Sequence, residues 1–290
     1  MRLAVITCHF NPQGYGQSRR NFLRFLRQMR SRGVPLFVAE LAFGEANFVT
    51  NFAPDVLQVR TDSDQVLWYK ENLLNLVEQI VPSIFDAMAW IDADVWFERP
   101  DWFEATETAL EQYPVVQMGD SIVRTCFDGT NGTIQQTAAV VGGLGQGEHH
   151  PGMAWAARRS LWTRGGGLYE HAIIGGGDAA VAGAWFPRAD DFKWLRYRDL
   201  PDGVKRLRDW KERRGQCGCV SGRIWHEWHG ADEHRQYGER IVLQSLLDIH
   251  RDLRKRTDGL LQWTMEAAPE LRREVREYFQ SRKEDGDCGP

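Results

Sequence analysis

The sequence contains no uninterrupted apolar run of about 18 residues, so we expect no membrane-spanning helix. Its first residues, MRLAVITCHF, pass directly into a polar turn and lack the length of a secretory signal. The five cysteines are scattered and odd in number, which favours a reduced, cytoplasmic protein over a disulfide framework. Internal repeats and low-complexity segments are also absent, so the 290 residues are expected to form one large domain or two small ones.

Neither sign of charge dominates the chain, and common nucleotide-binding motifs are missing. The 36 basic and 40 acidic side chains give a formal net charge of -4, which weighs against indiscriminate binding to nucleic acid. The first strand–helix connection lacks G-x-G-x-x-G, and no Walker A sequence is present. A dinucleotide-binding fold and a P-loop are therefore disfavoured.

What the chain does contain is an alternation of apolar runs and helical patterns. The amino-terminal part is expected to run β-α-β-β-α-β, which predicts an α/β fold with a mostly parallel sheet and helices on its faces. Ser18 and Asp64 are predicted to cap the two helices. The Gly-rich segment 119–150 is expected to be a loop, and the charged tail 282–290 to be frayed. The expected strands are 3–7, 35–41, 55–60, the one that begins at Ala89, 114–118 and 151–157. The expected helices are 18–32, 64–81, 102–112, 158–164 and 178–185. Residues 232–282 are expected to form a helical extension, with Leu260, Leu261, Trp263 and Met265 facing its core.

Two carboxylates end the stretch that begins as a buried strand at Ala89. Asp92 and Asp94 are two residues apart, so in an extended segment they point to the same side. Converging like charges need a cation or a shared proton, and a divalent ion that binds a diphosphate would supply the cation. The alternative is a simple strand-end turn, where Asp is common.

A second polar region lies between residues 150 and 184. Gly175, Gly176 and Gly177 would let the backbone approach a bulky ligand closely, and Asp178 follows them directly. Asp178 would be a general base at the rim of a cleft, or only the cap of the helix that it opens.

Histidines and basic residues gather toward the carboxyl-terminal third. Cys217, Cys219, His226 and His229 suggest a zinc site, but their spacing differs from that of common zinc modules. The segment 205–214 carries a net charge of +4, which indicates a surface for an acidic partner or, more simply, a solvated helix face.

In their order along the chain, these motifs resemble those of nucleotide-sugar glycosyltransferases with the GT-A fold. The resemblance covers residues 1–230 and rests on the first strand, on KENLLN at 70–75, on WIDAD at 90–94, on GMAWA at 152–156 with GGGD at 175–178, and on WHG at 228–230. It implies a nucleotide-binding half at 1–118, an acceptor half at 119–230 and a carboxyl-terminal helical extension at 231–290.

The resemblance also implies site residues. Asp92 and Asp94 with His229 would hold Mn²⁺ or Mg²⁺, Asp178 would be the catalytic base, and the donor would be a nucleotide sugar, with a UDP-sugar as the first choice. Because GGGD lacks the double acid of many inverting relatives, both inverting and retaining transfer of a hexose or pentose remain open. The donor site would comprise Thr7, His9, Phe10, Asp62, Lys70, Asn75, Asp92 and Ala93, and the acceptor site Trp155, Gly176 and Gly177.

Several functions stay open at this point. The acceptor would be a glycan or, as in phage-type enzymes, a hydroxymethylpyrimidine in DNA. The DNA acceptor is suggested by the arginines of 18–32 and by the basic segments 205–214 and 251–256. A nucleotidyltransferase would share the acidic metal ligands and would need a phosphate-binding loop, for which residues 11–20 offer Gly14, Gly16, Arg19 and Arg20. The third alternative is a sugar-binding module without catalytic activity.

Overall fold

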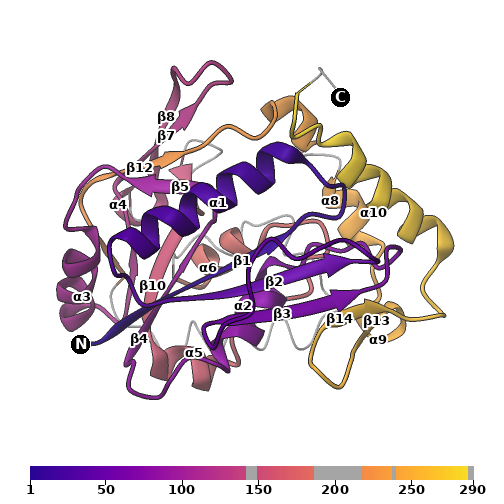
Figure 1. Cartoon of the computed structure of the whole chain (residues 1–290), viewed down its shortest axis with the longest axis horizontal. Helices are drawn as coiled ribbons and strands as arrows, with labels where there is room; N and C mark the ends of the chain where they lie inside the picture. Colours follow the sequence, from indigo (N-terminus) through magenta and orange to yellow (C-terminus); the bar gives the residue numbers. More distant parts are fainter. Residues whose placement is uncertain (142–148, 186–216, 237–239, 287–290) are drawn as a thin grey trace.

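A seven-stranded mixed sheet forms the centre of the molecule, as the computed structural model shows for residues 1–141, 149–185, 217–236 and 240–286 (Figure 1). The α/β fold with helices flanking a mostly parallel sheet is therefore confirmed. Strands β1, β2, β3 and β4 run parallel to one another, β10 is antiparallel to both β4 and β6, and β11 is parallel to β6. The strand order is β11 (Cys217–Cys219), β6 (Val115–Gln117), β10 (Ala154–Arg158), β4 (Ala87–Ile91), β1 (Leu3–Phe10), β2 (Leu36–Phe43) and β3 (Val56–Thr61).

Helices cover both faces of this sheet because its central strands are apolar on both sides. Successive side chains of β1 alternate between the faces. Ala4 and Ile6 belong to the cluster of α2 (Lys70–Glu78), whereas Leu3 and Val5 pack with α1 (Gly16–Ser31). The other helices around the sheet are α3 (Trp102–Gln112), α4 (Ala138–Val141), α5 (Arg159–Gly165) and α6 (Gly177–Trp185).

A second sheet stands where the sequence suggested only a long loop. Its order is β5 (Val95–Phe97), β12 (Arg223–His226), β7 (Ser121–Thr125), β8 (Asn131–Thr137) and β9 (His149–His150). The loop expected over 119–150 is thus wrong for residues 121–141. Asp128-Gly129 makes the hairpin turn between β7 and β8, with Gly129 at φ 79°, and Asp-Gly is a known hairpin signal. β8 is largely polar, so its sequence lacks the alternation of apolar and polar residues that would have predicted a strand.

The carboxyl-terminal part is mixed rather than wholly helical. Leu261 and Trp263 lie in a strand of a two-stranded sheet and Met265 is 97% exposed, so the helical core run expected there is wrong. Apolar residues two apart suit the buried side of a strand, and Leu261 and Trp263 have that spacing. The elements are η3 (Asp232–Arg235), α8 (Arg240–Ser245), α9 (Ile249–Asp252), β13 (Leu253–Lys255), β14 (Leu261–Trp263) and α10 (Pro269–Ser281).

Tertiary contacts replace three local features that the sequence suggested. Ser18 lies inside α1, whose first amide groups, those of Gly16 and Gln17, donate to the Asp285 carboxylate at 2.9 and 2.6 Å. Asp64 precedes α2 by several residues and instead pairs with Arg272 at 2.6 Å. The part of the tail up to residue 286 is packed on the protein rather than frayed. Within the described part of the chain, no helix has the length and apolarity needed to cross a membrane.

Candidate active site

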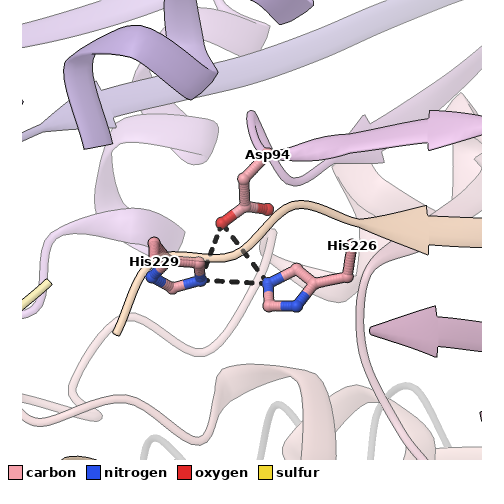
Figure 2. A group of neighbouring side chains, drawn as sticks. All are labelled: Asp94, His226 and His229. Carbon is pink, nitrogen blue, oxygen red and sulfur yellow. Dashed lines mark hydrogen bonds and ion pairs between the residues drawn. The ribbon is translucent and has the colours of Figure 1, made fainter. Parts of the chain in front are cut away.

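Three potential metal ligands converge where the two sheets meet. β4 ends at Ile91, and the turn that follows carries Asp94 immediately before β5. β12 pairs antiparallel with β5 so that His226 lies opposite Val95, and the Glu227 amide donates to the Asp94 carbonyl at 2.8 Å. The Nε2 atoms of His226 and His229 lie 3.5 and 3.1 Å from Asp94 Oδ2 and 3.0 Å from each other (Figure 2).

This arrangement fits a divalent ion. An octahedral ion with ligands at about 2.1 Å has neighbouring ligand atoms about 3 Å apart, close to the spacing found here. Asp94 Oδ1 is buried and has no hydrogen-bond partner within the described residues. One carboxylate with two imidazoles, all on one side, suits Mn²⁺ or another transition ion and leaves further coordination positions open.

The protonation states also suit an ion. Burial would raise the pKa of the Asp94 carboxyl, but His226 and His229 hold that pKa well below its usual value. Burial lowers the pKa of His226 to about 4, so its imidazole is neutral at neutral pH. A carboxylate and neutral imidazoles are the forms that bind metal ions.

A buried lysine joins the other two predicted acidic residues. Lys70 Nζ lies 2.5 Å from Asp92 Oδ1 and 2.9 Å from Asp178 Oδ1. Burial would lower the pKa of Lys70, but the two carboxylates raise it well above its usual value, so the ammonium stays charged. Burial raises the pKa of Asp92 to about 7, an effect that Lys70 opposes and Asp178 strengthens. Gly152 makes room for this cluster, because a Cβ there would lie 2.8 Å from Asp178 Oδ2.

Both clusters line one cleft of about 610 Å³ beyond the carboxyl ends of the parallel strands. Ligands of open α/β sheets bind at this edge. Nine of the site residues that the resemblance implied line the cleft: His9, Phe10, Lys70, Asp92, Ala93, Asp94, Gly176, Asp178 and His229.

The remaining predicted site residues lie outside the lining of this cleft. Thr7 donates to the Ile91 carbonyl at 2.7 Å and so ties β1 to the end of β4. The side-chain amide of Asn75 donates a hydrogen bond to the Leu168 carbonyl and accepts one from the Leu168 amide. Trp155 is 0% exposed, so its ring has no surface on which a ligand could stack. Asp62 is exposed, and Gly177 packs against the Glu71 side chain.

The structure separates the residues of the suggested zinc site. Cys217 and Cys219 lie in β11, and burial raises the pKa of their thiols to about 12 and about 11, so both stay protonated. In the described ranges the histidines cluster with Asp94 and not with these cysteines. The basic segment 205–214 lies outside the described residues.

Sequence analysis missed four functional candidates, all of which line the cleft. His226 was considered only for zinc, and its place beside Asp94 depends on the pairing of β12 with β5. The others were Arg235, Arg282 and Glu284 from the carboxyl-terminal part. Apart from their charge, no sequence signal marks these three.

Comparisons with known proteins find remote structural likenesses. No protein-family model and no curated protein matches the chain. It is similar to a mutant Drosophila β1,4-galactosyltransferase 7 in complex with manganese, UDP-Gal and xylobiose, at 13% identity over 77% of this chain and 68% of that one, with a TM-score of 0.37. It is also similar to residues 1–349 of TarS from S. aureus, at 9% identity over 97% and 71% of the two chains, with a TM-score of 0.42.

A further likeness is to a putative glucose-1-phosphate thymidylyltransferase from Bacillus anthracis, in complex with a sucrose. The identity is 10% over 86% of this chain and 96% of that one, with a TM-score of 0.38. Other matched structures are described as glycosyltransferases or nucleotide-diphospho-sugar transferases, the group whose motifs the sequence resembles. The likenesses are remote, and the site itself has to indicate the function.

Proposed function

We propose that this protein is a metal-dependent glycosyltransferase that moves a sugar from a nucleotide diphosphate sugar to an acceptor hydroxyl. The observation that carries the proposal is the placement of Asp94, His226 and His229 around one point at the edge of the cleft. A divalent ion there would neutralise the charge that develops on a departing diphosphate.

The two clusters divide the cleft between the parts of the donor. The diphosphate would lie at Asp94, His226 and His229, and the nucleoside would lie toward the end of β1, where His9 and Phe10 line the cleft. The sugar would then face Lys70, Asp92 and Asp178. A UDP-sugar is the first donor to test, with Mn²⁺ as the first ion because imidazole ligands suit it better than Mg²⁺.

Asp178 is the group that we assign as the base. As the acceptor oxygen bonds to the anomeric carbon and the bond from that carbon to the diphosphate oxygen breaks, the hydroxyl proton passes to the Asp178 carboxylate. Lys70 Nζ lies 2.9 Å from Asp178 Oδ1 and so holds that carboxylate in place. Transfer by this route inverts the anomeric carbon, and the configuration of the product, measured by NMR, tests it.

For the acceptor we propose a glycan hydroxyl rather than a base in DNA. Much of the basic segment 251–256 is already paired: Arg251 with Asp252, Lys255 with Glu170, and Arg256 with Asp258, at 2.5 to 2.6 Å. The arginines of α1 remain on an exposed helix face. Binding to duplex DNA that falls steeply with added salt would favour the DNA acceptor instead.

A nucleotidyltransferase is the second possibility, and the structure disfavours it at one point. The loop before α1 would have to cradle a triphosphate with free amide groups. The amides of Gly16 and Gln17 are instead occupied by the Asp285 carboxylate. Formation of a nucleotide sugar from a nucleoside triphosphate and a sugar phosphate would support this alternative.

The central experiment measures ion-dependent donor binding. Nucleotide sugars are screened with Mn²⁺, Mg²⁺ and, without oxygen, Fe²⁺, because two histidines and one carboxylate also bind iron in oxygenases. We expect thermal stabilisation and donor hydrolysis with Mn²⁺ in the wild type, and loss of both in Asp94→Asn and His226→Ala. Glu277→Gln, at an exposed position of α10, is the matched control. Equal responses in the wild type and in the Asp94 and His226 variants would refute the proposal, and a sugar-binding module would bind sugar without ion or nucleotide.

A further inference from the structure

The segment 278–286 packs against the amino-terminal end of α1. Tyr15 Oη donates to the carbonyls of Phe279 and Gln280 at 3.0 and 2.8 Å. The Asp285 carboxylate accepts hydrogen bonds from the first two amide groups of α1. The segment is therefore fixed at both ends over the cleft, and Figure 1 shows α10 beside the start of α1.

Between these anchors the segment buries an ion pair beside the candidate metal site. Arg282 and Glu284 are 6% and 9% exposed, and Arg282 Nη2 lies 2.6 Å from Glu284 Oε1. The Arg282 guanidinium also lies over the Trp68 ring, 5.1 Å from its centroid. Its position is thus fixed independently of Glu284.

Glu284 faces the one nitrogen of His229 that does not point at Asp94. Its Oε1 lies 3.8 Å from His229 Nδ1, while His229 Nε2 lies 3.1 Å from Asp94. The backbone supports this orientation, because Gly230, at φ 95°, packs so closely on the segment that a Cβ would lie 3.0 Å from the Arg282 carbonyl.

Arg235 contacts both nitrogens of the His229 ring. Arg235 Nη2, which can only donate, makes the shorter of its two contacts with the ring at Nε2, at 2.7 Å. An ion at the proposed site would bind the lone pair of Nε2, which faces Asp94, so the proton of a neutral His229 would lie on Nδ1, toward the Glu284 carboxylate. In metal sites, a carboxylate behind a histidine ligand fixes its tautomer and ring orientation.

We propose that Glu284 is a positioning residue for His229 and that the segment 278–286 is part of the metal site. The inference rests on the proposed ion at Asp94, His226 and His229. Removal of Glu284 would leave all three ligands in the protein but would free the His229 ring, so ion affinity would fall while the fold is kept.

A purely structural role is the competing explanation, because loss of Glu284 also leaves Arg282 buried without its partner. Two variants separate the roles. Glu284→Gln keeps the size of the side chain and removes its charge, whereas the double variant Arg282→Met with Glu284→Met removes both charges and leaves no unpaired one. Glu277→Gln on α10 is the surface control.

Isothermal titration with Mn²⁺ alone is the test, together with thermal unfolding of the metal-free proteins. We expect Mn²⁺ affinity to fall about 10- to 100-fold in both Glu284 variants, the loss usual for partners of metal ligands. We also expect the double variant to unfold near the wild-type temperature and Glu277→Gln to match the wild type in both measurements. Glu284→Asp, which keeps the charge, should recover part of the affinity.

Two results would overturn the inference. If the wild type binds Mn²⁺ and both Glu284 variants bind it equally well, Glu284 does not position His229, and the proposed function stands. If the wild type binds none of the divalent ions, the inference fails together with the proposed metal site.

Discussion

Arg235 Nη2 lies 2.7 Å from His229 Nε2, the same ring nitrogen that faces Asp94 and His226. An ion bound to this lone pair therefore has to displace the guanidinium. Arg235 lines the cleft, so once displaced it stays close to the proposed diphosphate position. Arg235 thus contacts the nitrogen atom that a divalent ion at the proposed site would bind.

Arg235→Leu should affect ion and nucleotide binding in opposite directions. Loss of the competing donor and of its positive charge should tighten Mn²⁺ binding in the absence of nucleotide by about 3- to 10-fold, the size of one hydrogen bond. Binding of UDP in the presence of Mn²⁺ should weaken, because one cation near the diphosphate is lost. Calorimetric titrations check both effects, with the exposed Arg273→Leu as control. Changes of the same sign in both affinities would contradict this competition.

Lys70→Met should destabilise the fold strongly. The change leaves Asp92 and Asp178 facing each other without their shared cation, and breaking a buried ion pair typically costs about 3–5 kcal/mol. Arg99→Met is the matched control, since its pair with Asp101 is exposed and screened by solvent, so its loss should change stability little. Urea unfolding measures both changes. Similar losses in the two variants would show that Lys70 does not hold the acidic pair together.

Gly152→Ala should impair sugar transfer without weakening the ion site. A Cβ at this position would lie 2.8 Å from Asp178 Oδ2 and would push that carboxylate away from Lys70. We expect at least a 10-fold fall in kcat, since positioned proton transfer contributes about 10²- to 10⁴-fold. Mn²⁺ affinity should stay within about 2-fold of the wild type, because the nearest atoms to the added Cβ belong to Asp178 and His150 and not to Asp94, His226 or His229. If kcat is unchanged in this variant, Asp178 is not the catalytic base.

His9 should make the stability of the protein depend on pH. Burial, with its ring stacked 4.2 Å from that of Phe22, lowers the pKa of His9 from 6.5 to about 4. The folded state therefore disfavours the protonated ring, and its stability contribution is complete above pH 6.5 and is lost as the pH falls from 6.5 through 4.

The variant His9→Phe should flatten this pH dependence while keeping the stacked ring. The difference in unfolding free energy between pH 7 and pH 4.5 should shrink by about 1–3 kcal/mol, as a shift of this size implies. Denaturant unfolding at several pH values measures it, with the exposed His250→Gln as control. An unchanged pH profile in His9→Phe would assign the effect to other buried groups, such as His150.

The elements that the sequence predicted best are those with strong local patterns. The apolar run before Asp92 indicated the strand that ends at the cleft, and the helix expected over 18–32 matches most of α1. Asp94 and His229 were both suggested as metal ligands, and the structure brings them together. Local pattern sufficed here because a strand end fixes where the next side chains point.

The remaining features depend on contacts between distant residues. His226 reaches Asp94 only through the pairing of β12 with β5, and nothing local to either strand specifies that pairing. Arg282 and Glu284 looked like a solvated charged tail, yet they pair in the protein interior. The polar strand β8 shows the same limit, because its hydrogen-bond partners rather than its own side chains make it a strand.

The cap that Asp285 supplies to α1 joins residues 268 positions apart. Such a contact closes a very long loop, so we expect it to form late in folding. During synthesis, the amides of Gly16 and Gln17 are made long before the carboxylate that satisfies them. A chain with its central sheet already assembled would therefore still lack the ordered segment around Glu284. An ion that binds only the completed protein would then draw this last folding step to completion by mass action.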